Sequence, residues 1–394
     1  MKQLLQTGGM LAVCASLFAC ASPIQTMSAR DAVKYGNEQF YSMPSYRMDM
    51  NAKVMHLGFV GASTDESFKD SEAINKYMNF FGKNFVFNGV GVFDTVKEQY
   101  QIIPQYGYEA KNINARIRFP LVLDRKAKLL YADLSALDGI VTNLDNAGKY
   151  SRFDLSKLPI PEGSDKKLVD VMRKYSNLMF DKVSAEAITE QALTSEDRKL
   201  NGVRKLQLTL KPQEQIALFP EMVDEMMGIF TPASSANADQ KKDEMKQEVE
   251  KFKAGISEWL SPESRDLYTL TFNRAGQIVS MKTDSNYLIN PKEEGTSTTP
   301  IETEKPAPKG FQMHLVTDVT VSDIGKAQLI DPPTAENSVD GIENLKKSPL
   351  GKLFFQKYDE NAHSDDLDVA QAAIDATATP AQKAKKLRKK RTNR

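Results

Sequence analysis

Histidines and carboxylates are the side chains of this 394-residue sequence that could carry acid–base or metal chemistry. The three histidines are His56, His314 and His363, and none stands in a Gly-x-Ser-x-Gly elbow or a His-Glu-x-x-His pair. Nucleophilic hydrolysis needs a base beside its nucleophile, and the sequence contains no Gly-rich phosphate loop or dinucleotide fingerprint. It therefore predicts a protein that is not an enzyme and needs no cofactor. A hydrolase that uses two carboxylates stays an alternative, because two such residues can be distant in the sequence and still be neighbours in the folded chain.

One stretch near the carboxyl end has the composition of a cation site. His363 is followed by three aspartates within five residues, and 358–380 contains six acidic residues and no Lys or Arg. A calcium loop needs a Gly and a terminal Glu at fixed positions, and this stretch has neither. We therefore expect a solvated acidic segment and no metal site.

The composition, 41% hydrophobic and 26% charged, is typical of a folded chain. Cys14 and Cys20 are the only cysteines, which excludes a disulfide framework and a thiolate metal site. After residue 19 no apolar run approaches the roughly 20 residues that a membrane-crossing helix needs. The body is therefore not expected to be a polytopic membrane protein.

Residues 1–19 have the composition of a secretion signal. Lys2 supplies a positive charge, and the apolar run 10–19 has half the length of a membrane span. We exclude this segment from the fold and expect the mature chain to begin at Cys20. The alternative is an ordinary cleaved signal that leaves Cys20 as an unpaired thiol.

Leu17, Phe18, Ala19 and Cys20 resemble the lipobox of bacterial lipoproteins, with Phe18 in place of the usual small or β-branched residue. The resemblance implies that acyl groups such as palmitate are attached to Cys20, and two or more such chains anchor a protein stably. Ala21 follows Cys20 where an Asp would otherwise stand, a feature that resembles lipoproteins of the outer membrane. We therefore expect a lipid-anchored protein of the bacterial cell envelope, in the periplasm and at the outer membrane.

The carboxyl end is an acidic block followed by a basic one. Residues 381–394 hold eight Lys or Arg and no acidic residue. Such runs are usually solvated. In a sharper interpretation the basic block contacts lipid head groups, lipopolysaccharide phosphates or cell-wall polymer, each cation contributing about 1 kcal/mol near a charged membrane. Export argues against nucleic acid as a partner. The candidate contact residues are Lys385, Lys386, Arg388, Lys389, Lys390 and Arg391.

Much of the body alternates apolar and polar residues with a period of two, which predicts strands wetted on one face. In 46–54, Met48, Met50 and Val54 alternate with Asp49 and Lys53. The same period predicts strands over 84–93, 97–109, 113–123, 128–134, 181–192, 203–211, 311–321 and 327–330, and a hairpin over 267–289 with its turn at 274–277.

Other segments show the single apolar stripe of an amphipathic helix. They are 31–43, 164–180, a stretch after Pro212 that Pro220 restarts, and 238–260. One-sided strands imply an antiparallel sheet, because parallel strands buried on both faces would be continuously apolar. The predicted fold is α+β, a large curved antiparallel sheet of about 11 strands forming a half-barrel, with helices covering its concavity.

Four stretches carry a family resemblance: strand 202–211 with the helix after it, hairpin 267–289, the closing stretch 317–333 (TDVTVSDIGKAQLIDPP), and the entry helix followed by 46–55. They resemble the LolA/LolB and LppX/LprG superfamily of bacterial lipid and lipoprotein carriers. The similarity spans residues 30–335, whereas helix 238–260, the linker and the tail have no counterpart. It implies a half-closed barrel that holds an acyl chain between the sheet and its helices.

The sequence thus divides into five parts. They are the signal 1–19, a tether 20–30, a half-barrel domain 31–335 with a linker at 291–310, a helical extension 336–357 and the acidic-then-basic tail 358–394.

Methionine usage gives a hint about the ligand. Fourteen of the sixteen methionines follow the signal, and many lie on apolar stripes. Flexible, polarizable side chains suit a cavity that adapts to acyl chains, although such stripes more often form ordinary core. The residues expected to line the concavity are Met48, Met50, Met172, Met222, Met226, Phe230 and Phe252.

We therefore expect a membrane-anchored lipoprotein that binds a lipid or an acylated partner without catalysis. The alternative is a structural or assembly scaffold that contacts an envelope protein or a cell-wall polymer through its charged tail. Deleting 358–394 separates the two, because a carrier would keep its ligand and a scaffold would lose its partner.

Overall fold

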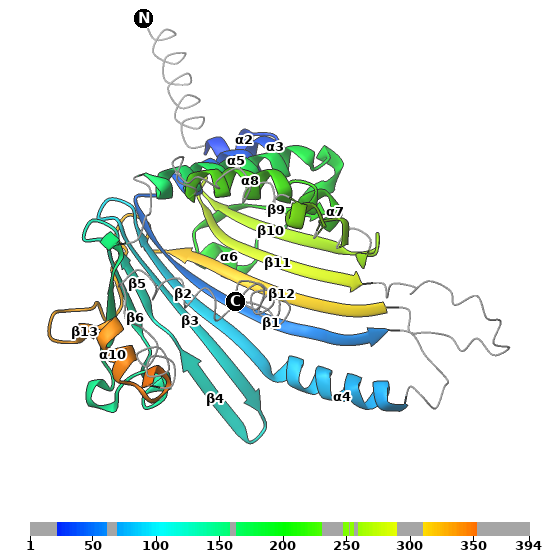
Figure 1. Cartoon of the computed structure of the whole chain (residues 1–394). Coiled ribbons are helices and arrows are strands. Elements are labelled where there is room, and N and C mark those ends of the chain that lie inside the picture. The colour runs from blue at the N-terminus through cyan, green and yellow to red at the C-terminus, as the bar shows by residue number, and fades with distance from the viewer. Residues whose placement is uncertain are drawn as a thin grey trace, which may run out of the picture. The chain divides into compact units, whose positions relative to one another are not determined.

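The computed structural model describes residues 22–60, 69–157, 163–230, 247–251, 253–255, 259–289 and 310–352. The chain forms two compact units, Met1–Ala136 with Gly148–Asp340, and Leu137–Ala147 with Gly341–Arg394. The larger unit contains the sheet shown in Figure 1. No helix among these described residues is long and apolar enough to cross a membrane.

The larger unit is built on a 13-stranded sheet in the order β13-β7-β6-β5-β3-β2-β1-β12-β11-β10-β9-β8, with β4 paired to β3 (Figure 1). The described strand pairs are antiparallel except β13 with β7. The strands are β1 (Ser45–Val60), β2 (Phe85–Asp94), β3 (Gln99–Ala110), β4 (Ile113–Arg118), β5 (Leu121–Asp124), β6 (Leu129–Asp133), β7 (Tyr150–Asp154), β8 (Ile188–Glu190), β9 (Gly202–Leu210), β10 (Arg265–Asn273), β11 (Ile278–Ile289), β12 (Gly310–Ser322) and β13 (Ser338–Asp340). Because β13 and β8 end this order, the sheet is open rather than closed into a barrel.

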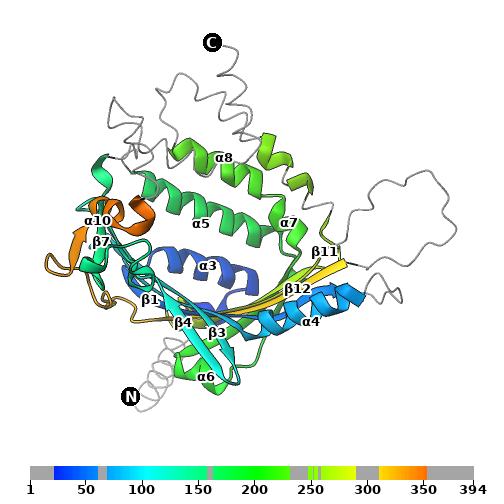
Figure 2. The ribbon, with the colours of Figure 1, turned by 60° about the horizontal axis from the view of Figure 1, so that its bottom comes forward.

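Helices pack on one face of this sheet. They are α2 (Pro23–Thr26), α3 (Ala29–Tyr41), α5 (Ser164–Lys182), α7 (Pro212–Ile216) and α8 (Phe219–Phe230), with α4 (Lys69–Asn84) beside β1 and α6 (Ser195–Lys199) before β9. Figure 2 shows α3 next to the sheet, α5 above α3, and α8 above α5. The predicted α+β class, with a large, mostly antiparallel sheet and covering helices, is confirmed.

The main core lies between α3 and the strands β8 to β11. Val33 of α3 packs in one cluster with Leu206, Leu208 and Phe272 of the sheet, and these four side chains are fully buried. Ser28 caps the start of α3, because its side chain accepts a hydrogen bond from the backbone N–H of Asp31. The carboxylate of Asp31 lies in the first turn of the helix, where the helix dipole favours a negative charge. The core therefore covers one end of the sheet order.

Several predicted elements differ from those observed. The predicted strand 113–123 is two strands, β4 and β5, because Pro120 between them has no N–H to donate to a ladder. The predicted strand 181–192 shrinks to β8, since α5 continues to Lys182. Residues 327–330 are not a strand. There the buried Gln101 side chain bonds both backbone groups of Ile330, donating to its carbonyl at 2.6 Å and accepting from its N–H at 2.7 Å.

The smaller unit contains α10 (Gly341–Lys347) and a loop with the 3₁₀ turn at Leu144–Asn146. The buried Asn344 joins the two, because its Oδ1 accepts from the N–H of Asn143 and from Nδ2 of Asn146, both at 3.2 Å.

Candidate functional site

The two faces of the sheet are identified by its register. Residues paired across neighbouring strands share a face, and Leu208 belongs to the core that packs under α3. The row that contains Leu208 runs across eight strands as Leu208, Tyr268, Thr283, Thr317, Ala52, Phe87, Tyr106 and Ile117. We call the face that carries this row the inner face.

The inner face is apolar over the central strands. On β1 it carries Met48, Met50 and Val54, whereas Asp49 and Lys53 point to the other face. The neighbouring strands add aromatic rings. Phe87 and Tyr106 have ring centroids 5.2 Å apart, and Tyr46 stacks on Phe93 at 4.9 Å. Over β1, β2 and β3 the face is therefore a surface of aliphatic and aromatic side chains.

Two glycines let larger side chains lie flat on this face. A Cβ built at Gly91 would lie 2.5 Å from the ring of Phe93, and one at Gly89 would lie 3.2 Å from Cε of Met50. A side chain at Gly91 would therefore displace the Phe93 ring.

Helices cover only part of the inner face. Under α3 the apolar side chains of β9 and β10 are buried. On β3 and β4, Ile102, Tyr106 and Ile117 are respectively 49%, 43% and 47% exposed. Phe85 and Ile113 are also exposed. We call these five residues the open wall. An exposed apolar surface of this extent is a mark of a binding site.

Burial keeps three phenols that lie on the inner face neutral at physiological pH. Burial raises the pKa of Tyr268 to about 12, and burial also raises the pKa of Tyr46 and of Tyr287. They therefore add no negative charge that would repel an apolar or anionic ligand.

The helices α5 and α8 pack on each other through an apolar interface of their own. Val171 and Tyr175 of α5 meet Ile229 of α8 in this cluster. The contact between α5 and α3 is polar by comparison, with Asn37 Nδ2 donating to Asn177 Oδ1 at 2.8 Å. Helix α5 therefore packs mainly on α3 and α8, and its last turn, with Met179 and Phe180, joins the main core.

The predicted lining residues fall in different places. Met48 and Met50 lie on the inner face. Met222 and Met226 pack in the cluster between α5 and α8, and Met172 is exposed on α5. The side chains of Phe230 and Phe252, the lipidation candidate Cys20 and the basic residues of the tail lie outside the described part of the chain.

The open wall was missed at the sequence level. Alternation shows that a strand has an apolar face, but it does not show which part of that face a helix will cover. The segment 113–118, INARIR, carries the clearest signal, since its isoleucines alternate with arginines and no acidic residue is present.

The two histidines in the described part of the chain lie away from the inner face. His56 and His314 are paired across β1 and β12 at a bulge, on the face opposite to Val54. His314 Nε2 lies 2.8 Å from Asp284 Oδ1. Burial, Lys83 and His314 together lower the pKa of His56.

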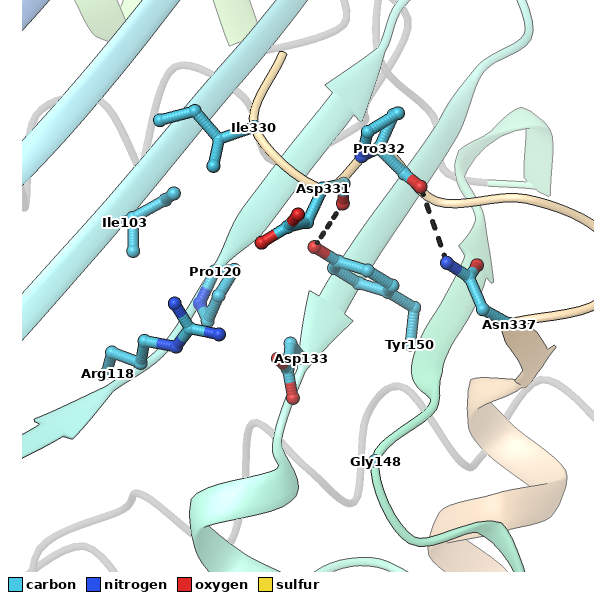
Figure 3. Close-up of a pocket in the computed structure, with 10 residues that line it drawn as sticks. All are labelled: Ile103, Arg118, Pro120, Asp133, Gly148, Tyr150, Ile330, Asp331, Pro332 and Asn337. Carbon is cyan, nitrogen blue, oxygen red and sulfur yellow. Dashed lines mark hydrogen bonds between the residues drawn. The ribbon is translucent and has the colours of Figure 1, made fainter.

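A cavity of about 330 Å³ lies on the face opposite to the inner face, and Figure 3 shows its lining. Tyr150 donates its hydroxyl to the carbonyl of Asp331 at 3.0 Å, beside the segment that Gln101 holds. Arg118 and Asp133 also line the cavity, together with the Asp331 carboxylate. Charged groups of both signs distinguish this cavity from the apolar inner face.

No family model and no curated protein matches this sequence. Among solved structures, the chain is similar to LprF from Mycobacterium bovis, with 10% identity, a TM-score of 0.30, and coverage of 78% of this chain and 97% of that one. It is similar to lipovitellin, in a study of lipid–protein interactions, with 9% identity, a TM-score of 0.23, and coverage of 75% of this chain and 27% of that one. It is similar to the N-terminal β-barrel domain of Pseudomonas aeruginosa OprF, with 6% identity, a TM-score of 0.13, and coverage of 71% and 98%. All three scores are below 0.5, so we use the geometry of this chain alone for its function.

Proposed function

We propose that this chain is a lipoprotein of the bacterial cell envelope that binds a lipid or another acylated molecule along its inner face, without catalysis. The observation that carries the proposal is the open wall, where apolar side chains of β2, β3 and β4 are exposed on the same face whose β9 and β10 side chains are buried under α3.

An acyl chain is the ligand that suits this surface. Each methylene that leaves water for an apolar surface contributes about 0.8 kcal/mol. The row from Ala52 through Phe87 and Tyr106 to Ile117 crosses four neighbouring strands, spaced about 4.8 Å apart. An extended chain could therefore lie across the strands and contact apolar side chains along its length.

The proposed anchor fixes which end of the sheet faces the membrane. Ser22 donates its hydroxyl to the carbonyl of Arg274 in the turn between β10 and β11. This turn lies at the Ser45 end of β1. Met281, near the start of β11, pairs with Val319 of β12, and Val319 pairs with Met50, near the start of β1. Cys20 is two residues before Ser22 in the sequence, so acyl groups there would hold the body by this end.

Binding of cis-parinaric acid to the purified full-length chain tests the proposal. The variant Tyr106→Asp/Ile117→Asp places two charges on the open wall, and we expect it to bind the probe at least tenfold more weakly, since a ligand would have to desolvate them. The matched control is Gln105→Asp/Asn114→Asp, which places the same charges on the opposite face of the same two strands. We expect the control to bind as the wild type does. Equal affinities of all three proteins would contradict a ligand site on the inner face.

A further inference from the structure

Helix α4 takes the place of a strand at one end of the sheet. It runs directly into β2 at Asn84 and lies beside the last residues of β1, where β2 has no residues to pair. Asn75 accepts a hydrogen bond from the N–H of Phe59 at 2.7 Å and donates to its carbonyl at 3.0 Å. Asn79 accepts from the N–H of Leu57 at 3.4 Å. Helix α4 is thereby held against the edge of β1.

This attachment determines what α4 presents to solvent. Successive residues of a helix are rotated by about 100° around its axis. The side of α4 that carries the two asparagines faces β1, and Lys76 and Lys83 lie next to that side. Tyr77 and Phe80 point away from β1. Tyr77 is 66% exposed and Phe80 is 54% exposed. Ile74, on the remaining flank, is exposed as well.

The hairpin of β3 and β4 continues this pattern. The ring of Phe80 lies 6.3 Å from the ring of Tyr108, which is on the inner face of β3. On β4, Ile113 and Ile117 face inward, whereas Arg116 faces outward and pairs with Glu109. The tips of α4 and the hairpin thus combine exposed apolar side chains on one side with cations on the other.

The charges at this end are mostly positive. Helix α4 contains three lysines and two acidic residues, and 109–118 contain a lysine, two arginines and one acidic residue, Glu109. The acidic residues of α4, Asp70 and Glu72, are confined to its first turn.

We propose that this end of the sheet, formed by α4 and the β3–β4 hairpin, docks on the surface of an anionic lipid bilayer. The proposal deepens the proposed function and rests on it, because it names the surface from which an acyl ligand reaches the open wall. A helix with lysines on one side and aromatic and aliphatic residues on another lies in the membrane interface rather than across it. Each of its cations contributes attraction to anionic head groups.

The docking end and the proposed anchor lie at opposite ends of β1. The 16 residues of β1 span roughly 50 Å at about 3.3 Å per residue. A protein held at its Ser22 end would therefore present α4 to a second membrane surface rather than to the one that anchors it.

The test uses a single tryptophan as a probe of depth. Trp259 is the only tryptophan, so full-length Trp259→Phe/Tyr77→Trp reports on α4 alone. With vesicles of phosphatidylglycerol brominated along its acyl chains, we expect blue-shifted and quenched emission. With brominated phosphatidylcholine vesicles we expect at least tenfold more lipid to be needed for half-quenching. A probe placed on α5, Trp259→Phe/Val169→Trp, should not be quenched.

Charge reversal supplies the matched comparison. Lys76→Glu/Lys83→Glu in the α4 probe protein should raise the phosphatidylglycerol concentration for half-quenching at least tenfold. Lys166→Glu/Lys167→Glu on α5 has the same charge change, and it should alter this concentration less than twofold. Quenching that is absent, equal in both lipids, or weakened equally by both charge reversals would overturn the docking proposal. In that case, if Lys76→Glu/Lys83→Glu still binds cis-parinaric acid as the wild type does, the docking proposal is wrong and the inner-face site is not affected.

Discussion

At the scale of single residues, Asp197 shows how one carboxylate joins three elements. Its carboxylate accepts from Lys205 Nζ of β9 at 2.8 Å, from the N–H of Thr194 at 2.7 Å, and from the hydroxyl of Thr271 of β10 at 3.0 Å. Burial alone would raise the pKa of Asp197, but these donors outweigh it and hold the pKa at about 2. The folded pKa is thus below the unfolded value, so the stabilisation is present above about pH 4 and is lost as the pH falls toward 2.

The variant Asp197→Asn tests this assignment. It should lower the unfolding free energy at pH 7 by about 2 kcal/mol and flatten its dependence on pH between 4 and 2, because the shifted carboxyl is gone. Urea denaturation across this pH range measures both effects. Asp170→Asn, which removes an exposed carboxylate from α5, is the control and should cost less than about 0.5 kcal/mol. A variant that keeps the wild-type pH dependence would show that Asp197 is not the group responsible.

At the scale of elements, the contact of α4 with β1 protects an edge that would otherwise be unpaired. Asn75→Ala removes both hydrogen bonds to Phe59. We expect amide exchange at Phe59 to accelerate at least tenfold, with a loss of about 1 kcal/mol in unfolding free energy. Hydrogen exchange of residues 57–60 measures the change. Asn112→Ala, in the turn between β3 and β4, should leave that exchange unchanged. Unaltered exchange in Asn75→Ala would contradict the edge role of α4.

Elements with a strict period were predictable from the sequence. The alternation of 46–54 specifies β1, and the single stripe of 164–180 specifies α5. Helix α4 was not predicted. Its position depends on hydrogen bonds from the backbone of β1 to the side chains of Asn75 and Asn79, and no local sequence pattern shows such contacts between two elements. The segment 327–330 was predicted as a strand, since alternation cannot show that its backbone partners are a glutamine side chain.

The sequence predicts the apolar character of the candidate site but not its position on the sheet. An apolar concave face follows from one-sided strands, and Met48 and Met50 were named as part of it. Which part of the face remains open depends on where α3 packs, and α3 covers β8 to β11 while leaving β3 and β4 exposed. Coverage is decided by tertiary packing, so the alternation in 113–118 could indicate an apolar face but could not show that Tyr106 and Ile117 stay exposed.

At the scale of the larger unit, four roles are assigned to different parts of the sheet. Helix α3 and strands β8 to β11 supply the buried core, and the open wall on β2 to β4 supplies the proposed binding surface. The Ser22 end carries the proposed anchor and the α4 end carries the proposed docking surface. Stability and the proposed ligand binding therefore depend on different strands of one sheet.

Native mass spectrometry of the full-length chain, purified from membranes in a mild detergent, tests the central claim most directly. The open wall predicts a bound lipid or acylated molecule in excess of any acyl groups attached to Cys20, and it predicts that Tyr106→Asp/Ile117→Asp loses this molecule while Gln105→Asp/Asn114→Asp retains it. A wild-type chain that carries nothing beyond its covalent modifications would contradict the claim.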